Sequence, residues 1–450
     1  MKGYWFMNEC YDGKFVCRGG RTYTIKYGIT ELFKRMFQDN EDIVHVILPN
    51  SVKIIGEHAF FGCKNLETVV LPDSVIDIQS FAFACCKKLT SINIPASVKK
   101  IGADFVGRCS SLRKLIIPNT VQEISSNSFS ACEQLEEIVL PDCLKVMPRF
   151  EKCTSLKTIT IPNGITEIRG STFKKCISLK NVNFSKSVNI IGGMAFFGCS
   201  SLENITIPGN VETISNDAFG ECVNLKRVKI EYGVKTIGRL AFWECYKLEQ
   251  IEIPNSVTTI EDNVFYQCQS LREIEIPESV TDMEMCFYGC SNLRSVTIPK
   301  TMKSTSLEFS KCQSLVNIII PDHITELTSI AFENCTNLKS VTWPIKVFNS
   351  CIAEEGFINC TSLENIVIPD GIVEIPNKTF YNCSNLTCVY LPKSISSIQK
   401  MAFDKCNNLR NIYFAGSKQD WKNIKIDFGN EKLTGGIFTR AKIHYNYSAT

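Results

Sequence analysis

The sequence predicts a mostly β solenoid built from stacked copies of one short repeat. The stretch at residues 66–88 reads L-E-T-V-V-L-P-D-S-V-I-D-I-Q-S-F-A-F-A-C-C-K-K, and its apolar skeleton returns along most of the 450-residue chain. A cysteine fills the same repeat position in sixteen copies, and a leucine follows each cysteine three residues later. Self-similarity with a period of roughly 20–29 residues is the signature of a solenoid, in which stacked copies share one continuous core.

The repeat length is nearly constant. Eleven of the fifteen intervals between successive copies of the proline position are 23 residues long, and the others are 21, 22, 22 and 25. Phenylalanine stands three residues before each cysteine of the column, except at Val106. Each residue type is therefore expected to form one buried column. The cysteine column comprises Cys63, Cys86, Cys109, Cys132, Cys153, Cys176, Cys199, Cys222, Cys245, Cys268, Cys290, Cys312, Cys335, Cys360, Cys383 and Cys406.

Three segments are expected within each repeat. Leu-x-x-Ile-x-Ile alternates in polarity and predicts a short strand, which proline ends because proline cannot donate to a ladder. Ser-Val-x-x-Ile predicts a second short extended segment. Ala-Phe-x-x-Cys predicts a helical turn that places phenylalanine in the core. In the copy at residues 66–88, Val69 and Leu71 are expected to point inward, and Thr68 and Val70 outward.

The two ends of the chain depart from the repeat. Residues 1–25 are predicted to form an N-terminal cap. The solenoid is predicted over residues 26–414, as one degenerate repeat followed by sixteen regular repeats, and residues 415–450 are predicted to form a C-terminal cap. Such ends are expected because one face of a terminal repeat meets water.

The cysteines are expected to be buried free thiols. Twenty-three cysteines would usually indicate disulfides or a metal site. Stacked cysteines of one column lie about 4.8 Å apart but point in parallel, which disfavours disulfide bonds along it. No C-x-x-C occurs and the four histidines are scattered, so we expect no metal and no cofactor. Disulfides stay the alternative, and Cys10 with Cys17 is the pair to test for a bridge.

Several classes of function are disfavoured by composition and motifs. The net charge of +3, from 49 basic and 46 acidic residues, predicts no nucleic-acid binding and no strong attraction to membranes. No apolar run reaches about 18 residues, and residues 1–10 lack an apolar h-region, so neither a transmembrane segment nor a signal peptide is predicted. Without H-E-x-x-H, G-x-S-x-G or a phosphate-binding loop, no enzymatic activity is predicted. The sequons at Asn334, Asn359 and Asn382 are interpreted as by-products of the repeat.

The unit Ile-Pro-x-x-Val-x-x-Ile-x-x-x-Ala-Phe-x-x-Cys-x-x-Leu resembles the BspA-like class of leucine-rich repeats. The segment Tyr413-Phe414-Ala415-Gly416-Ser417 with Trp421, and the ending Ile443-His444-Tyr445-Asn446, are similar to the C-terminal cap of bacterial members. The resemblance covers about residues 26–446. It implies a leucine-rich-repeat solenoid with a parallel concave sheet, short extended segments and helical turns on its other faces, and no shared catalytic residues.

Two non-enzymatic functions stay open. Members of the resembled family are often surface or secreted proteins, some of them adhesins, which implies an adhesion or recognition protein that binds a protein through its concave face. The alternative is an intracellular scaffold or regulatory protein-interaction module, because no signal peptide is visible. The location therefore stays open between cell surface or secreted and cytoplasmic. The partner's identity and the oligomeric state are not predicted.

The candidate binding site is a charged strip in the middle of the predicted concave face. Outward positions two and four residues after the repeat leucine are mostly neutral near both ends and charged in the centre. Lys229 is expected beside Glu252, a favourable pair, and Glu252 beside Glu275, an unfavourable one. A merely solvated face is the alternative to a site for a partly basic partner. The strip comprises Arg227, Lys229, Glu249, Glu252, Arg272, Glu273 and Glu275.

Overall fold

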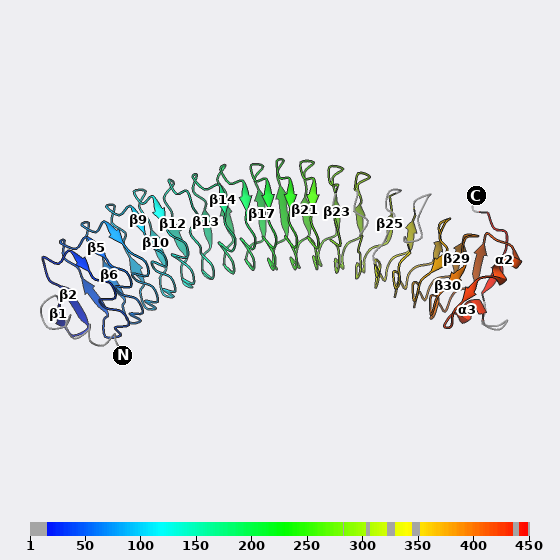
Figure 1. Cartoon of the computed structure of the whole chain (residues 1–450), viewed down its shortest axis with the longest axis horizontal. Helices are drawn as coiled ribbons and strands as arrows, with labels where there is room; N and C mark the ends of the chain where they lie inside the picture. The colour runs from blue at the N-terminus through cyan, green and yellow to red at the C-terminus, as the bar shows by residue number, and fades with distance from the viewer. Residues whose placement is uncertain are drawn as a thin grey trace. The chain divides into compact units, whose positions relative to one another are not determined.

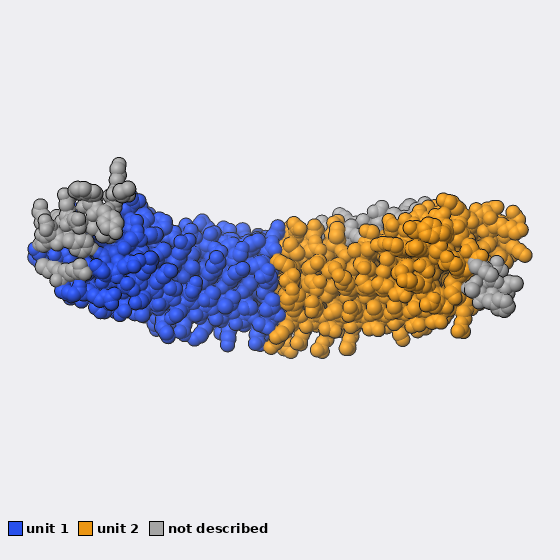
Figure 2. Space-filling view, turned by 90° about the horizontal axis from the view of Figure 1, so that it is seen from below, with its two compact units in different colours: residues 1–225 blue, residues 226–450 orange. Residues whose placement is uncertain are grey.

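The predicted parallel β solenoid is confirmed: ladders of short parallel strands run along the chain (Figure 1). The structure, a computed structural model, describes residues 16–281, 283–302, 307–321, 329–343, 352–434 and 441–448, with only the backbone of residues 17 and 18. The chain divides into two compact units, Met1–Leu225 and Lys226–Thr450 (Figure 2). Each unit contains strands of both ladders and members of the buried columns.

The first ladder consists of the Leu-x-x-Ile-x-Ile segments. Its strands pair in parallel at identical repeat positions, so that Thr68 lies opposite Ser91 and Val69 opposite Ile92. Side chains alternate between exposed and buried, as the sequence predicts. In Met1–Leu225 the strands are β4 (His45–Ile47), β6 (Thr68–Val70), β8 (Ser91–Ile92), β10 (Lys114–Ile116), β12 (Glu137–Val139), β13 (Thr158–Thr160), β15 (Asn181–Asn183) and β17 (Asn204–Ile207). In Lys226–Thr450 they are β19 (Arg227–Ile230), β21 (Gln250–Glu252), β23 (Glu273–Glu275), β24 (Ser295–Thr297), β25 (Asn317–Ile319), β26 (Ser340–Thr342), β27 (Asn365–Val367), β29 (Cys388–Leu391), β31 (Asn411–Phe414) and β33 (Lys442–His444).

The second ladder consists of two-residue strands that end on the repeat isoleucine. The copy that follows Pro141 is two residues shorter than most, and residues 142–156 contain no strand of this ladder. The second ladder therefore lacks a strand at this copy, and in the first ladder β12 and β13 are neighbours that belong to separate hydrogen-bonded sheets. The strands are β3 (Glu31–Leu32), β5 (Ile54–Ile55), β7 (Asp77–Ile78), β9 (Lys100–Ile101), β11 (Glu123–Ile124), β14 (Glu167–Ile168), β16 (Ile190–Ile191), β18 (Thr213–Ile214), β20 (Thr236–Ile237), β22 (Thr259–Ile260), β28 (Glu374–Ile375), β30 (Ser397–Ile398) and β32 (Lys425–Ile426).

The Ala-Phe-x-x-Cys segment takes the form of successive hydrogen-bonded turns. Around Phe60, each turn closes with a bond from residue i+3 to residue i, for example from Cys63 N–H to Phe60 O at 3.1 Å. The intervening amides bond to the next repeat instead, as Phe60 N–H does to Ala82 O at 2.8 Å. Two left-handed residues recur in most repeats, here His58 at φ 59° and Gly62 at φ 71°. These turns therefore make a third rung-to-rung ladder.

The repeat phenylalanines form a stacked aromatic column in the core. Neighbouring rings lie nearly parallel, with centroids 5.2 Å apart for Phe173 and Phe196. At the copy where Val106 replaces phenylalanine, the preceding Phe105 is fully buried and meets Phe83 edge-on at 5.8 Å. Phe105 thus adds one edge-on ring to the column at this copy, and the stacked rings begin again with Phe129 and Phe150.

The ladder cysteines are free, buried and hydrogen-bonded, and the expectation of buried thiols is confirmed for all sixteen. Fifteen of the thiols are seen to donate to the backbone carbonyl at the phenylalanine position of the preceding repeat, with S···O distances of 2.9–3.3 Å. For example, Phe60 O accepts from both Cys63 N–H and the Cys86 thiol. Cysteine therefore does more than fill space. The suggested Cys10–Cys17 bridge involves Cys10, which lies outside the described residues.

The N-terminal end closes the aromatic column with a hairpin. Strands β1 (Val16–Gly19) and β2 (Thr22–Ile25) pair antiparallel, and β2 continues in parallel with β4. Tyr23, fully buried, meets the ring of Phe37 edge-on at 6.1 Å. Within residues 26–48, Leu32 pairs with Ile55 in the second ladder, so the degenerate segment keeps the repeat register.

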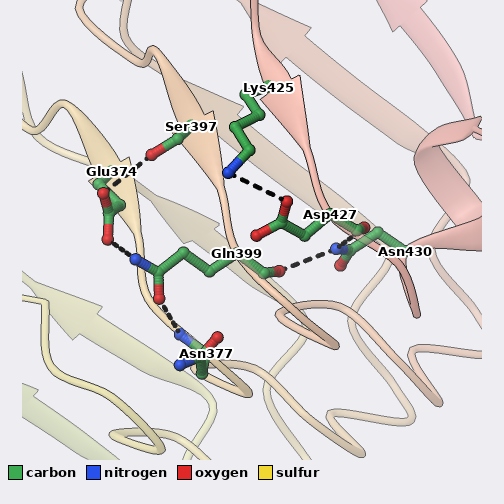
Figure 3. A network of polar contacts seen from close by, with 7 residues as sticks. All are labelled: Glu374, Asn377, Ser397, Gln399, Lys425, Asp427 and Asn430. Atoms are coloured by element: carbon green, nitrogen blue, oxygen red, sulfur yellow. Dashed lines mark hydrogen bonds and ion pairs between the residues drawn. The ribbon is translucent and has the colours of Figure 1, made fainter.

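The C-terminal end is joined to the last repeat by Asn430, which is 1% exposed. Its Nδ2 donates to Gln399 O at 2.9 Å and to Asp427 O at 2.8 Å, and its Oδ1 accepts Phe403 N–H at 3.0 Å. Gln399 in turn donates to the Glu374 carboxylate in the repeat before (Figure 3). The helices of this end are α2 (Lys418–Lys422), with a capping box at its start, and α3 (Glu431–Thr434).

We predict that Phe173→Ala destabilises the first unit by about 3–5 kcal/mol, the usual cost of truncating a buried phenylalanine. The ring stacks on both Phe150 and Phe196, so the cavity would open between two repeats. Urea unfolding followed by circular dichroism measures the change. Phe33→Ala is the matched control, because Phe33 is 46% exposed. Equal midpoints for both variants would refute a core role for this column.

We predict that stability falls steeply above pH 9. Burial raises the pKa of the Cys63, Cys176 and Cys222 thiols to about 12, whereas an unfolded thiol titrates near 8.5. The protonated thiols therefore stabilise the fold below about pH 8.5, and this contribution is lost as the pH rises towards 12. Each such thiol lowers the unfolding free energy by up to about 1.4 kcal/mol per pH unit. Melting temperatures between pH 8 and 10.5 test this, and Cys176→Ala should flatten the slope; a pH-independent melting temperature contradicts it.

We predict that Asn430→Ala loosens the C-terminal end selectively. The variant leaves the buried Phe403 N–H without its acceptor, which costs about 1–3 kcal/mol. Hydrogen exchange at Phe403 and across residues 425–434 should accelerate, while amides near Cys86 keep their protection. Asn423→Ala, at an exposed site, is the control. Unchanged exchange at Phe403 would show that Asn430 does not hold this end.

Candidate functional site

The predicted charged strip lies on the outer side of the first ladder in Lys226–Thr450. In β19, β21 and β23 the central apolar residues Val228, Ile251 and Ile274 are buried, and their neighbours along the strand face solvent. All seven predicted strip residues are exposed. Five of them lie on β19, β21 and β23, and Glu249 and Arg272 immediately precede β21 and β23, so the backbone that carries them is ordered before a partner binds.

The strand register brings part of the strip together as expected. Strand β19 pairs in parallel with β21, with Lys229 opposite Glu252 and Arg227 opposite Gln250. Strands β21 and β23 are neighbours in the first ladder but belong to separate hydrogen-bonded sheets, so the expected register of Glu252 with Glu275 stays a prediction. On its other side, β23 pairs with β24 and places Glu275 opposite the neutral Thr297. The strip thus runs from a basic repeat to an acidic one and ends at a neutral one.

Within the described residues, the charges of the strip are not paired, in contrast to several pairs of exposed charges in Met1–Leu225. In Met1–Leu225, exposed charges in adjacent repeats form ion pairs, such as Lys114–Glu137 at 2.9 Å and Lys157–Glu136 at 2.6 Å. Across the part of the chain that the structure describes, none of the seven strip residues forms an ion pair; Lys229 and Glu252 are register neighbours without one. Exposed ion pairs add little stability, so the lack of pairing costs the fold little. The strip charges are therefore available to pair with charges on a partner.

Two other parts of the same outer face were not identified from the sequence as binding surfaces. In Met1–Leu225, Ile47, Val70, Ile116 and Val139 are 46–70% exposed at the fourth position after the repeat leucine. The pairs Ile47–Val70 and Ile116–Val139 are register neighbours. These four apolar residues could have been found in the sequence by comparing the fourth residue after the leucine in successive repeats. The other surface is a group of aromatic rings on β29, β31 and β33.

The histidines near the N-terminus have structural environments. His45 Nδ1 lies 2.8 Å from the Thr68 hydroxyl of the next repeat. His58 stacks on Phe81 with centroids 4.7 Å apart, and burial lowers its pKa although Glu57 raises it. In the described ranges, no group of three or more His, Cys, Asp or Glu residues is arranged to hold a metal ion. No helix among those residues is long and apolar enough to cross a membrane.

Three sequon asparagines form a side-chain ladder. Asn359 Nδ2 donates to Asn334 Oδ1 at 2.8 Å, and Asn382 Nδ2 donates to Asn359 Oδ1 at 2.8 Å. Each residue precedes a ladder cysteine and has a left-handed backbone, with φ between 59° and 61°. Asparagine tolerates this conformation better than most residues. This structural role agrees with the interpretation of these sequons as by-products of the repeat.

Comparison with known proteins identifies the repeat. A family described as BspA type Leucine rich repeat region (6 copies) matches residues 30–149, 148–249, 235–351 and 345–426. No curated protein matches this sequence.

Among solved structures, the chain is similar to a leucine-rich repeat protein from Bacteroides ovatus. The identity is 25% over 89% of this chain and 90% of that one, with a TM-score of 0.58. It is also similar to a leucine rich cell surface protein from Faecalibacterium prausnitzii (24% identity, 92% and 97% covered, TM-score 0.32) and to the pneumococcal vaccine antigen PcpA (16% identity, 97% and 98% covered, TM-score 0.38). The first of these similarities shows the same fold.

Proposed function

The chain belongs to the BspA-type leucine-rich repeat family, and from this premise we propose that it is a non-enzymatic solenoid that binds a protein partner through the charged strip. Leucine-rich repeat proteins generally serve as binding modules. The observation that carries the proposal is the group of exposed strip charges without intramolecular partners, held on adjacent rigid strands. A preformed surface of this kind binds without a large ordering cost.

The charge order of the strip favours a partly basic partner. Arg227 and Lys229 stand on one strand, whereas Glu252, Glu273 and Glu275 follow on the next two. Lysine and arginine side chains of a partner would face the acidic part, and one acidic group would face the basic strand. Complementary charges of this type accelerate association and fix the orientation of the partner.

We propose an adhesion or recognition role at a cell surface or after secretion, in keeping with what the resemblance to the family implies. The intracellular scaffold or regulatory module is the second candidate. The observation that favours it is Cys143, a free and exposed thiol, which is better suited to a reducing compartment. The buried ladder thiols are compatible with both locations, because burial shields them from oxidants.

We also propose that residues 1–25 and 415–450 act as caps of the solenoid. Tyr23 covers the first phenylalanine of the aromatic column, and Asn430 supplies the hydrogen bonds that a further repeat would otherwise make. Terminal segments of a stacked array need such features, since their outer face meets no further copy.

We predict that the double substitution Glu252→Lys with Glu275→Lys weakens capture of a specific partner by at least about tenfold, as expected when like charges are placed against a basic surface. The immobilised chain is exposed to a cell-surface extract and to a cytosolic extract, and captured proteins are identified by mass spectrometry. Their affinities are then measured from about 50 to 500 mM salt, where binding through the strip should weaken.

The matched control is Glu167→Lys with Glu212→Lys, which makes the same change of charge at exposed residues on the second-ladder side of Met1–Leu225. Capture should survive in this control, and melting temperatures of both variants should match that of the unmodified chain. A partner that binds both double variants equally well, or with no dependence on salt, removes the strip as the binding site.

A further inference from the structure

An aromatic cluster lies on the outer side of the first ladder at the C-terminal end of Lys226–Thr450, well away in sequence from the strip. Tyr390, Tyr413 and His444 occupy the same register position on β29, β31 and β33. Their rings stack with centroids 4.8 Å and 4.6 Å apart and interplanar angles of 11° and 14°. Tyr447 packs obliquely against both tyrosines, at 5.3 Å and 5.2 Å. We refer to these four residues as the aromatic cluster.

The stacking decides which part of each ring meets solvent. The rings cover one another's faces, and all four side chains are only partly exposed. The cluster therefore presents ring edges and polar tips outward. Aromatic edges carry the positive part of the ring quadrupole, so they favour negatively charged or electron-rich groups. A ligand that would have to insert between two of the stacked rings is therefore not accommodated.

The side chains around the cluster add positive charge. Lys442 lies opposite Asn411 in the ladder, Arg410 immediately precedes β31, and both are exposed. Neither forms an ion pair with any residue that the structure describes. The outward positions of β27, β29, β31 and β33 hold no acidic residue. This surface is thus electrostatically opposite to the Glu252–Glu275 part of the strip.

The cluster also offers hydrogen-bond donors in fixed positions. A tyrosine hydroxyl is protonated at physiological pH and can donate, and burial, with smaller effects from Cys388 and the neighbouring tyrosines, raises the pKa of Tyr390 further. His444 Nε2 lies 3.1 Å from Asn411 Oδ1, which holds the imidazole in the column. Ring stacking immobilises these side chains before a ligand arrives, which lowers the entropy cost of binding.

We propose that the aromatic cluster, together with Arg410 and Lys442, is a second docking site that binds the carboxylate side chains of an acidic protein segment. The carboxylates lie against the ring edges, accept hydrogen bonds from the tyrosine hydroxyls and pair with the two cations. Tyrosine and arginine are the residue types that most often dominate binding energy at protein interfaces. The aromatic cluster would thus bind an acidic partner, whereas the strip is proposed to bind a partly basic one.

The test is selection of a displayed peptide library at low salt on the immobilised full chain that carries Glu252→Gln with Glu275→Gln, which weakens the strip as a site for basic peptides without making it basic. The peptides have random combinations of Glu, Lys, Ser, Leu and Tyr over roughly ten residues, long enough to span the cluster when extended. Selected peptides should be enriched in Glu over Lys by about threefold or more, as even one exposed charge pair would give. Lys442→Glu, at an exposed position, should abolish or reverse this enrichment.

Two further variants test whether the enrichment arises at the aromatic cluster. Tyr413→Ala should abolish the enrichment, and Tyr413→Phe, which keeps the stacked ring but lacks the hydroxyl, should retain part of it. The same selection on the unmodified chain distinguishes failure of the strip from failure of this site, because a functional strip adds Lys-rich peptides only there. The proposal is overturned if Lys is enriched over Glu, if neither is enriched, or if Glu enrichment survives Lys442→Glu with an unchanged melting temperature.

Discussion

Each repeat is tied to the one before it by a buried thiol that donates to a backbone carbonyl at the phenylalanine position. That carbonyl also accepts the N–H of the cysteine in its own repeat, so one oxygen serves both the local turn and the stack. The bond needs a small side chain with a donor in an apolar site, which cysteine supplies at a low desolvation cost. No repeat satisfies this arrangement alone, and the ordered state of every copy therefore depends on a neighbour.

This dependence makes the outer face of the first ladder a stable platform for variable residues. The inward positions are fixed as Leu, Val or Ile by the core, whereas the two outward positions of each strand are free to change. Lys226–Thr450 uses this freedom twice, with unpaired charges near its beginning and stacked aromatic rings near its end. These two surfaces of opposite electrostatic character are the basis of the two docking sites proposed above.

The sequence was sufficient to predict which residues of the strip face solvent and which of them are neighbours in the ladder. Counting from the repeat leucine was sufficient to place Arg227 and Glu275 on the outer face and Lys229 opposite Glu252. The lack of ion pairs in the strip could not be predicted, because side-chain pairing depends on rotamers that repeat positions do not specify. The aromatic cluster was missed because His444 and Tyr447 lie outside the repeat pattern and reach Tyr413 only after the chain has folded back along β33.

The sequence by itself determined the fold class, the burial of the columns and the free state of the ladder thiols, because periodic apolar residues have only one way to share a core. Only the tertiary structure showed the features that depend on contacts with the next repeat, namely the left-handed backbone conformations and the hydrogen bonds at the end of the stack. Residues such as His58 and Asp217 adopt left-handed backbones that cost about 1–2 kcal/mol each in an isolated chain. Hydrogen bonds to the next repeat, such as that from His58 N–H to Ser80 O, help to offset this cost. Asn430, similarly, has no repeat signature, since its role exists only where the last copy ends.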